Sequence, residues 1–223
     1  MDVTTTLQER LGAAVAARRL LDHPFYTAWA EGRLTLDDLR FYASQYWRQV
    51  EAFPGYLETL RDRLEPGSQA RAIVEANLAD ERDDDHPGLW LAFAAALGAA
   101  REDVRAATAE PETAACVDAF GSAMAAASLP FALGMLYGYE SQTPAVAETK
   151  VAGLRTHYGV EDGLDYFTLH GELDVEHAAE LVRALAEVAP NEPAVAEAEA
   201  GARAGAEAVW GLLDGVARVR ALA

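Results

Sequence analysis

The spacing of apolar positions along the chain is helical throughout. Apolar side chains recur every three or four residues, and no segment alternates as a half-buried strand would. Proline, glycine and capping residues such as Thr35 separate the periodic segments. The predicted helices span residues 4–20, 35–64, 67–80, 87–97, 112–141, 144–157, 163–188 and 193–221. We therefore expect an all-α bundle of seven to eight helices, with kinks at Pro54 and Pro130.

Length and composition narrow the class of protein. The chain has 223 residues and shows neither an internal repeat nor a flexible linker, so we expect a single domain over residues 1–223. A formal charge of −18 argues against nucleic acid and anionic membranes as partners. Cys116 is the only cysteine, which excludes an internal disulfide and fits a reducing cytoplasm. No signal peptide or membrane span is apparent, so we expect a cytoplasmic location.

Three potential metal ligands follow one another within the predicted helix 163–188. His170, Asp174 and His177 stand at positions i, i+4 and i+7, which places all three side chains on one helix face. The chain has only five histidines, so two of them on this stripe are informative. Imidazole and carboxylate groups on one face are typical of a transition-metal site.

Further ligands should come from other helices, because bundle metal sites collect inward-facing side chains from several of them. Glu140 ends an apolar run, 131–139, that carries no other charge, and a buried carboxylate needs a partner or a metal. A solvent-exposed helix end is the alternative for this residue. Glu81 and His86 flank an acidic break that could equally be a solvated charge run, and Glu75 is a rival to Glu81.

The candidate set indicates the kind of metal. It contains three carboxylates and three imidazoles: Glu81, Glu140, Asp174, His86, His170 and His177. Mixed nitrogen and oxygen ligation without thiolate favours iron or manganese over structural zinc, and six protein ligands suit two ions. Two divalent ions would bring four positive charges against three carboxylates, so the centre would be nearly neutral and could be buried.

The motifs of the chain, taken in order, resemble those of the chlamydial death-domain-associating protein (CADD) family. The resemblance covers about residues 10 to 220. It rests on Phe25-Tyr26-Thr-Ala-Trp29, Ala52-Phe-Pro-Gly-Tyr-Leu57, Asp80-Glu81, His86-Pro-Gly-Leu-Trp90, Tyr139-Glu140-Ser-Gln142, and Tyr166-Phe-Thr-Leu-His170 with Asp174 and His177. That family belongs to the heme-oxygenase-like diiron superfamily, which is related in fold to the PqqC and TenA proteins.

The resemblance implies a heme-oxygenase-like bundle that holds two metal ions, Fe/Fe or Fe/Mn, and uses O₂ as co-substrate. The family's ligand pattern falls on the six candidates named above. The spacing from Glu81 to His86 is shorter than the family pattern, which keeps Glu75 open as the first carboxylate. The resemblance also implies synthesis of p-aminobenzoate for folate, with Tyr26 as the sacrificed carbon skeleton, Lys150 as amino donor and Tyr139 as an electron or radical relay.

The lysine content gives this expectation independent weight. Of the 18 basic residues 17 are arginine, and Lys150 is the only lysine. Arginine cannot replace an amine nucleophile, because its guanidinium stays protonated. Burial beside a metal site would lower the pKa of Lys150 and free its lone pair. Chance retention on a helix surface is the alternative, and Tyr26 taken alone would be interpreted as a core aromatic residue.

Two other functions remain open at this stage. A dimetal oxygenase or oxidase could act on an external small molecule, in a pocket lined by helix 131–139 with Trp47, Phe53 and Trp90. A non-enzymatic protein-interaction module is the other. As partners, we expect an external reductant for a dimetal oxygenase. The alanine-rich segment 195–209 could also pack against a second copy in a homodimer.

Overall fold

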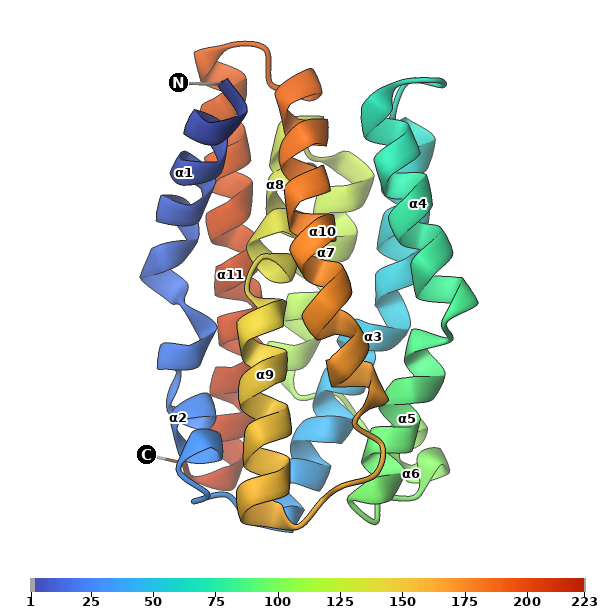
Figure 1. Ribbon diagram of the computed structural model, residues 1–223, viewed down its shortest axis with the longest axis vertical. Coiled ribbons are helices and arrows are strands. Elements are labelled where there is room, and N and C mark those ends of the chain that lie inside the picture. The colour runs from blue at the N-terminus through green and yellow to red at the C-terminus, as the bar shows by residue number, and fades with distance from the viewer. Residues whose placement is uncertain (1–2, 223) are drawn as a thin grey trace.

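A computed structural model describes residues 3–222 as a bundle of long helices whose axes run roughly along one direction (Figure 1). The predicted all-α architecture is confirmed. The elements are α1 (Val3–Val15), η1 (Ala16–Arg18), η2 (Leu20–Asp22), α2 (Pro24–Ala30), α3 (Leu36–Arg63), α4 (Gln69–Asp83), α5 (His86–Ala96), α6 (Arg101–Ala106), α7 (Pro111–Ala126), α8 (Leu129–Glu140), α9 (Thr143–Gly153), η3 (Leu154–Tyr158), α10 (Asp165–Val188) and α11 (Glu192–Arg220).

The chain is divided into more helical segments than the seven to eight expected. The segment 112–141 is two helices, because Ser128 accepts a hydrogen bond from the Phe131 N–H and starts α8 afresh. The short helices α2 and α6 were not expected as separate elements. Thr35 begins α3 with a reciprocal capping box, as its sequence predicts, and α3 then runs on through Pro54 to Arg63.

Helices α8 and α11 pack unusually closely, with small residues on both sides. A Cβ atom added to Gly134 would lie 2.1 Å from the Ala198 carbonyl oxygen, and one added to Gly201 would lie 2.0 Å from the Phe131 carbonyl oxygen. Only glycine permits such backbone approach. The alanine-rich face of α11 is therefore covered by α8 of the same chain and gives no support to a homodimer, which stays a prediction.

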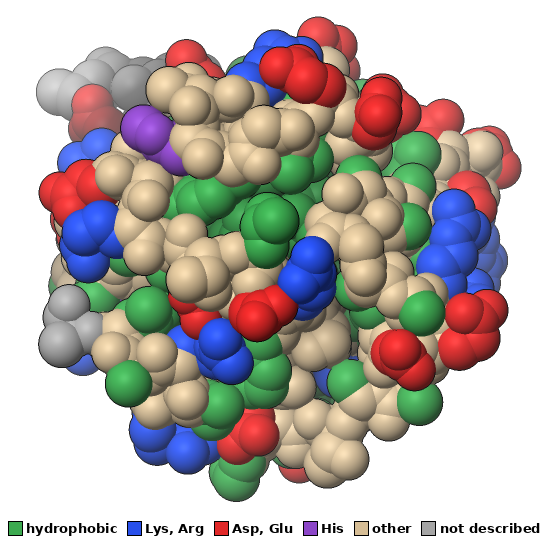
Figure 2. Space-filling model, turned by 90° about the horizontal axis from the view of Figure 1, so that it is seen from below, with side chains coloured by type: hydrophobic (Ala, Val, Ile, Leu, Met, Phe, Trp, Pro, Cys, Tyr) green, Lys and Arg blue, Asp and Glu red, His purple; other side chains and the backbone are tan. Residues whose placement is uncertain are grey.

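Charge is distributed unequally between surface and core. On the end of the bundle seen in Figure 2, acidic and basic side chains are interspersed between hydrophobic ones. Within residues 3–222 the buried charged side chains are few: Asp38, Glu81, Glu140, Lys150 and Asp174. Asp38 belongs to the capping box and also accepts a hydrogen bond from Arg220. The other four remain to be explained by function. None of the helices in residues 3–222 has the length and apolar content needed to cross a membrane.

Candidate metal centre and the adjoining tyrosine–lysine chamber

Helices α4, α5, α8 and α10 carry the six predicted ligands, and all six are at most 5% exposed. Glu81 comes from α4, His86 from the first residue of α5, Glu140 from the end of α8, and the remaining three from α10. Glu75, the rival carboxylate, lies on the exposed side of α4 and pairs with Arg71 at 2.9 Å. Of the two carboxylates, Glu81 is therefore the one near the other ligands.

Glu81, His86 and His170 form the tightest part of the cluster. One potential ligand atom from each lies within 4.8 Å of the other two. The His86 Nδ1 atom is 2.9 Å from Glu81 Oε1, and the His170 Nε2 atom is 3.8 Å from the same oxygen. The His86 contact is short, but its alignment is not that of a hydrogen bond, so both His86 nitrogens lack a hydrogen-bond partner. Ligand atoms gathered around a common point have this arrangement.

The turn between α4 and α5 explains how a short spacing can still bring Glu81 and His86 together. Asp85 adopts the left-handed conformation with φ of 49°, which aspartate tolerates better than most residues. Its side chain caps α5 by accepting a hydrogen bond from the Gly88 N–H at 3.2 Å. A Cβ atom at Gly88 would lie 2.0 Å from the Asp85 carboxylate. This compact turn starts α5 directly beside the end of α4.

The ring orientation of His170 is fixed by its own helix. Its Nδ1 atom is 2.7 Å from the Tyr166 carbonyl oxygen, an acceptor, so Nδ1 carries the proton and Nε2 presents a lone pair. The Tyr166 ring stacks on the imidazole with centroids 4.1 Å apart. Metal-binding histidines are usually oriented by such a hydrogen bond from the second nitrogen.

Glu140, Asp174 and His177 form the looser part of the cluster. Asn77 donates a hydrogen bond to Glu140 Oε1 at 3.0 Å, while Glu140 Oε2 is buried without a partner. The His177 Nδ1 atom is 3.3 Å from Asp174, and its Nε2 atom is 3.1 Å from Asp80 at the edge of the cluster. His177 is thus held between two carboxylates.

Burial and close neighbours shift the pKa values of the ionisable side chains in the cluster. Burial alone would raise the pKa of Glu81, but His170 and His86 reverse the effect and hold it at about 2. Burial and the neighbouring Asp174 raise the pKa of Glu140 to about 8. Burial lowers the pKa of His177, yet Asp174, Glu140 and Asp80 together raise it to about 10. A bound cation would stabilise the ionised form of the three buried carboxylates.

These residues fit a metal centre on structural grounds. The buried side-chain atoms that lack hydrogen bonds in residues 3–222 include both His86 nitrogens and Glu140 Oε2, and such orphaned atoms are costly unless something binds them. The donors are three imidazoles and three carboxylates without sulfur, a set suited to iron or manganese. Glu81, Glu140, His170 and Asp174 line one common internal cavity.

A second internal cavity adjoins the first, and we refer to it as the tyrosine–lysine chamber. Tyr139, Tyr166 and His170 line both cavities and separate them. The chamber is lined further by Leu20, Tyr26, Tyr46, Thr143, Val146, Ala147, Lys150 and Phe167. Each cavity has a free volume of only about 10 Å³, which is room for about one water-sized molecule.

Lys150 is fully enclosed in the chamber. Its Nζ atom lies between 4.9 and 5.6 Å from the centroids of the rings of Tyr26, Tyr42, Tyr46, Trp90 and Phe167. Its hydrogen bond goes to the Tyr42 hydroxyl at 2.7 Å, and no carboxylate within residues 3–222 pairs with it. Burial lowers the pKa of Lys150 to about 7, so a large fraction of it is a neutral amine at physiological pH.

Tyr26 lies beside this amine. Its hydroxyl is 3.3 Å from that of Tyr42, so Tyr42 connects Tyr26 and Lys150. Helix α2 is fixed at its start by His23, whose Nδ1 atom accepts a hydrogen bond from the Phe25 N–H at 3.0 Å. Burial raises the pKa of Tyr26, so the phenol is neutral. The structure therefore brings the two residues implied by the family resemblance into one chamber.

Tyr139 connects the chamber to the metal centre. It precedes Glu140 in α8, and its hydroxyl accepts a hydrogen bond from Tyr46 at 2.9 Å. Four residues that take part in these contacts were not predicted from the sequence: Tyr42, Tyr46, Asn77 and Tyr166. Two of them had a usable signal, because Asn77 and Tyr166 each precede a predicted ligand by four residues and so share its helix face.

Sequence comparison with known proteins points to the same kind of site, a metal centre. Residues 40–210 match the family of iron-containing redox enzymes. The chain is 35% identical over 225 residues to a 4-aminobenzoate synthase from Nitrosomonas europaea, covering 96% of this chain and 92% of the relative. It is also 35% identical over 217 residues to a 4-aminobenzoate synthase from Chlamydia muridarum, covering 96% and 91%.

A solved structure tests the fold separately. A domain of unknown function from Shewanella denitrificans, described as having a heme oxygenase-like fold, superposes with a TM-score of 0.84. The alignment covers 100% of this chain and 94% of that one, at 18% identity. The predicted heme-oxygenase-like fold is confirmed, and the buried Glu81, His86 and His170 set is suited to the metal that an iron-containing family implies.

Proposed function

Because this chain belongs to the heme-oxygenase-like family of iron-containing redox enzymes, we propose that it is a 4-aminobenzoate synthase that consumes its own Tyr26. Relatives with that name cover almost the whole chain, including one from Chlamydia, as the CADD resemblance led us to expect. Lys150 is the amino donor in this proposal. The enzyme would serve folate biosynthesis in the cytoplasm.

The observation that carries the proposal is the content of the chamber. A phenol and an amine that is partly neutral near pH 7 are enclosed together, next to the ligand cluster, where only about 10 Å³ is free. Pockets for external small molecules are usually about 300–1,000 Å³. The chamber is therefore too small for an external aromatic substrate, whereas O₂ is small enough to enter such a space. The reacting aromatic ring is already part of the chain.

Each residue has a part in this chemistry. Glu81, His86, Glu140, His170, Asp174 and His177 would hold two ions, Fe/Fe or Fe/Mn. The bound metals would activate O₂, which is the oxidant, and an external reductant would supply electrons. Tyr42 orients the Lys150 amine through its 2.7 Å hydrogen bond, and the low pKa of Lys150 frees the nitrogen lone pair. Tyr139 and Tyr46 form a hydrogen-bonded pair between the two cavities that can relay an electron with a proton.

The alternative enzymatic function, oxidation of an external small molecule, has less support. Phe53 lines the metal cavity, but Trp47 and Trp90 line neither internal cavity. The Trp90 indole N–H instead donates a hydrogen bond to the Ala43 carbonyl oxygen, and the ring belongs to the aromatic core. A purely structural interaction module would have no need for a buried ligand cluster with orphaned polar atoms.

Isotope labelling tests the proposal at single-residue resolution. Because Lys150 is the only lysine, protein grown with ε-¹⁵N-lysine carries the label at one position. A purification tag for this experiment must lack lysine. We expect anaerobically prepared protein, loaded with iron and manganese and then given reductant and O₂, to release ¹⁵N-labelled 4-aminobenzoate. Ring-¹³C-tyrosine should label the carbon skeleton in a parallel sample.

Mass spectrometry of the intact protein and of its proteolytic peptides locates the sacrificed residue. The reacted protein should lose mass in the peptide that contains Tyr26, and Tyr26→Phe should release no product. Tyr56→Phe is the matched control, since the Tyr56 hydroxyl bonds to the Val117 carbonyl oxygen away from both cavities. Unlabelled product from the ring-¹³C-tyrosine protein, or product from Tyr26→Phe, would exclude self-sacrifice and favour an external substrate.

A further inference from the structure

A surface pocket shares a wall with the tyrosine–lysine chamber. It lies between the α1–η1–η2 segment and helices α8 and α9, and its volume is about 310 Å³. Val146 lines both the pocket and the chamber. Leu20 lines the chamber, while its two chain neighbours, Arg19 and Leu21, line the pocket. The side chains of Leu20 and Val146 thus lie in the wall between the two spaces.

A single side chain holds this partition in place. The Gln142 carboxamide accepts a hydrogen bond from the Leu20 N–H at 2.7 Å and donates one to the Gly138 carbonyl oxygen at 3.2 Å. Leu20 begins η2, a single 3₁₀ turn whose preceding residue gives it no side-chain cap. Short 3₁₀ turns are held less firmly than long helices, so this is the part of the chamber wall that can move at the lowest cost.

The pocket has the chemistry to bind an aromatic carboxylate. Its walls include apolar side chains such as Val15, Leu21 and Tyr137. Arg19 is exposed at the pocket, and its guanidinium forms no hydrogen bond or ion pair within residues 3–222. An unpaired guanidinium can bind a carboxylate in a bidentate manner. In a chain with a net charge of −18, such a site is where an organic anion would be retained.

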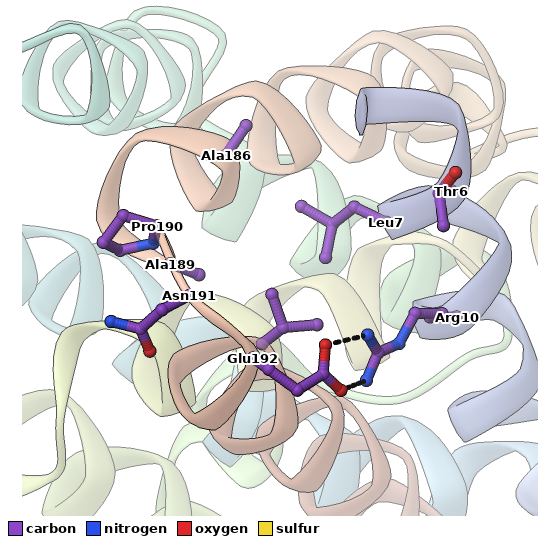
Figure 3. A pocket seen from close by; sticks show the side chains of 9 residues that line it. Thr6, Leu7, Arg10, Ala186, Ala189, Pro190, Asn191 and Glu192 are labelled. Atoms are coloured by element: carbon purple, nitrogen blue, oxygen red, sulfur yellow. Dashed lines mark hydrogen bonds and ion pairs between the residues drawn. The ribbon is translucent and has the colours of Figure 1, made fainter. Parts of the chain in front are cut away.

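Two other surface pockets lack this combination. The pocket between α1 and the turn from α10 to α11 contains Arg10, but Arg10 already pairs with Glu192 (Figure 3). Glu199 accepts a further hydrogen bond from Arg10. That pocket shares no lining residue with the chamber.

The groove between α9 and α10 does border the chamber, through Ala147 and Phe167. Its rim carries Glu148 and Glu172, and its Arg155 is paired with Glu161 at 3.6 Å. Carboxylates on the rim would repel an anionic product there.

We propose that the pocket beside Arg19 is the exit site for the aromatic carboxylate product, which leaves the chamber past Leu20 and Val146 and is bound through its carboxylate by Arg19. This assignment rests on the proposed function, because it takes 4-aminobenzoate as the ligand.

Binding of the product itself is the first test. 4-Aminobenzoate is titrated calorimetrically into the full-length, metal-loaded protein under anaerobic conditions, where no turnover occurs. We expect Arg19→Gln to weaken binding at least tenfold. Arg18→Gln is the matched control, since the neighbouring Arg18 guanidinium lies over the Trp210 ring at 5.4 Å, and it should bind as the wild type does. Aniline, which lacks the carboxylate, should bind the wild type at least tenfold more weakly. Equal binding by both arginine variants, or no binding up to about 10 mM, would overturn the proposal.

Blocking the pocket is the second test. A Cβ atom at Gly12 meets nothing within 4 Å, so Gly12→Trp fills the pocket without a backbone clash. After one exposure to O₂, rapid gel filtration should leave most of the product with the Gly12→Trp protein and free it from the wild type. Gly55→Trp, at another helical glycine with open space, is the control.

The two tests separate failure of the exit site from failure of the proposed function. If product forms from Tyr26 but Gly12→Trp releases it as fast as Gly55→Trp, the exit assignment is wrong and the function stands. If no product forms at all, the calorimetric test still decides whether Arg19 binds an aromatic carboxylate.

Discussion

The metal centre and the tyrosine–lysine chamber lie side by side, yet they treat buried charge in opposite ways. In the metal centre, carboxylates and imidazoles lie close together, and histidines hold the pKa of Glu81 at about 2. In the chamber one amine lies among five aromatic rings with no carboxylate to balance it, and its pKa falls to about 7. The metal centre therefore favours binding of cations, and the chamber favours the neutral, deprotonated form of Lys150.

This difference indicates a division of labour. Orphaned acceptor atoms such as Glu140 Oε2 prepare the first region for metal ions. Desolvation prepares the second region for amine chemistry, because a neutral lysine is the form with a free lone pair. The same low-polarity core produces both effects, and the presence or absence of neighbouring carboxylates decides between them.

The largest expected effect is loss of metal. Glu81→Gln keeps the size of the side chain but removes the negative charge of the carboxylate that His86 and His170 both contact. For the proposed two-ion centre, we expect bound metal to fall to one ion or none, and product formation to fall at least about 100-fold. Elemental mass spectrometry and single-turnover yield measure the two effects. Glu75→Gln should change neither, because Glu75 is a surface partner of Arg71; equal losses in both variants would remove Glu81 from the ligand set.

Removing the buried amine should abolish product and stabilise the protein. Burial lowers the pKa of Lys150 from the ordinary lysine value of 10.5 to about 7, so the unfolded chain binds more protons than the folded one between pH 7 and 10.5. The contribution of Lys150 to stability should therefore rise with pH across that window, by at most about 5 kcal/mol. Lys150→Met should be more stable at pH 7, with the advantage shrinking toward pH 10. Urea unfolding of the metal-free proteins measures this, and a constant difference from pH 7 to 10 would contradict it.

Much of this organisation is visible in the sequence, but not its contacts. Helical periodicity predicted the long helices, and a lone carboxylate in an apolar run drew attention to Glu140, which the structure shows to be 2% exposed. The break before α8 had a readable signal in Ser128-Leu-Pro130, a cap followed by a proline in the first turn. Tyr42 had none, because a tyrosine on an amphipathic helix looks the same whether its hydroxyl meets water or a buried lysine.

The distinction between the two regions also depends on tertiary structure. Lys150 stands out as the only lysine, yet its low pKa follows from rings on four other helices, α2, α3, α5 and α10, that no local pattern assigns to it. The short spacing between Glu81 and His86 left Glu75 as a rival on sequence grounds. The left-handed turn at Asp85 resolves how so short a loop can bring the two ligands together.

Removal of the Tyr42 hydroxyl, which connects the Lys150 amine to the Tyr26 phenol, should have a smaller effect on product yield. Tyr42→Phe leaves Lys150 without its hydrogen bond, and an unsatisfied buried donor costs about 1–3 kcal/mol. We expect the yield of 4-aminobenzoate to drop about 10- to 100-fold while the metal content stays unchanged. Tyr158→Phe is the control, since that hydroxyl bonds to the Trp29 carbonyl oxygen outside the chamber. Loss of metal in Tyr42→Phe would show that the two regions are not separable.

The smallest expected effect is at the turn that brings His86 to the cluster. Asp85→Ala removes the cap of α5 and places a residue without a capping side chain at a φ of 49°. We expect a loss of about 1–2 kcal/mol in unfolding free energy, together with weaker binding of metal. Asp85→Asn should retain most of both, because asparagine caps helices and tolerates the left-handed conformation. Urea unfolding and metal titration of the two variants measure these changes. Equal metal affinity in Asp85→Ala and the wild type would mean that His86 reaches the cluster without help from this turn.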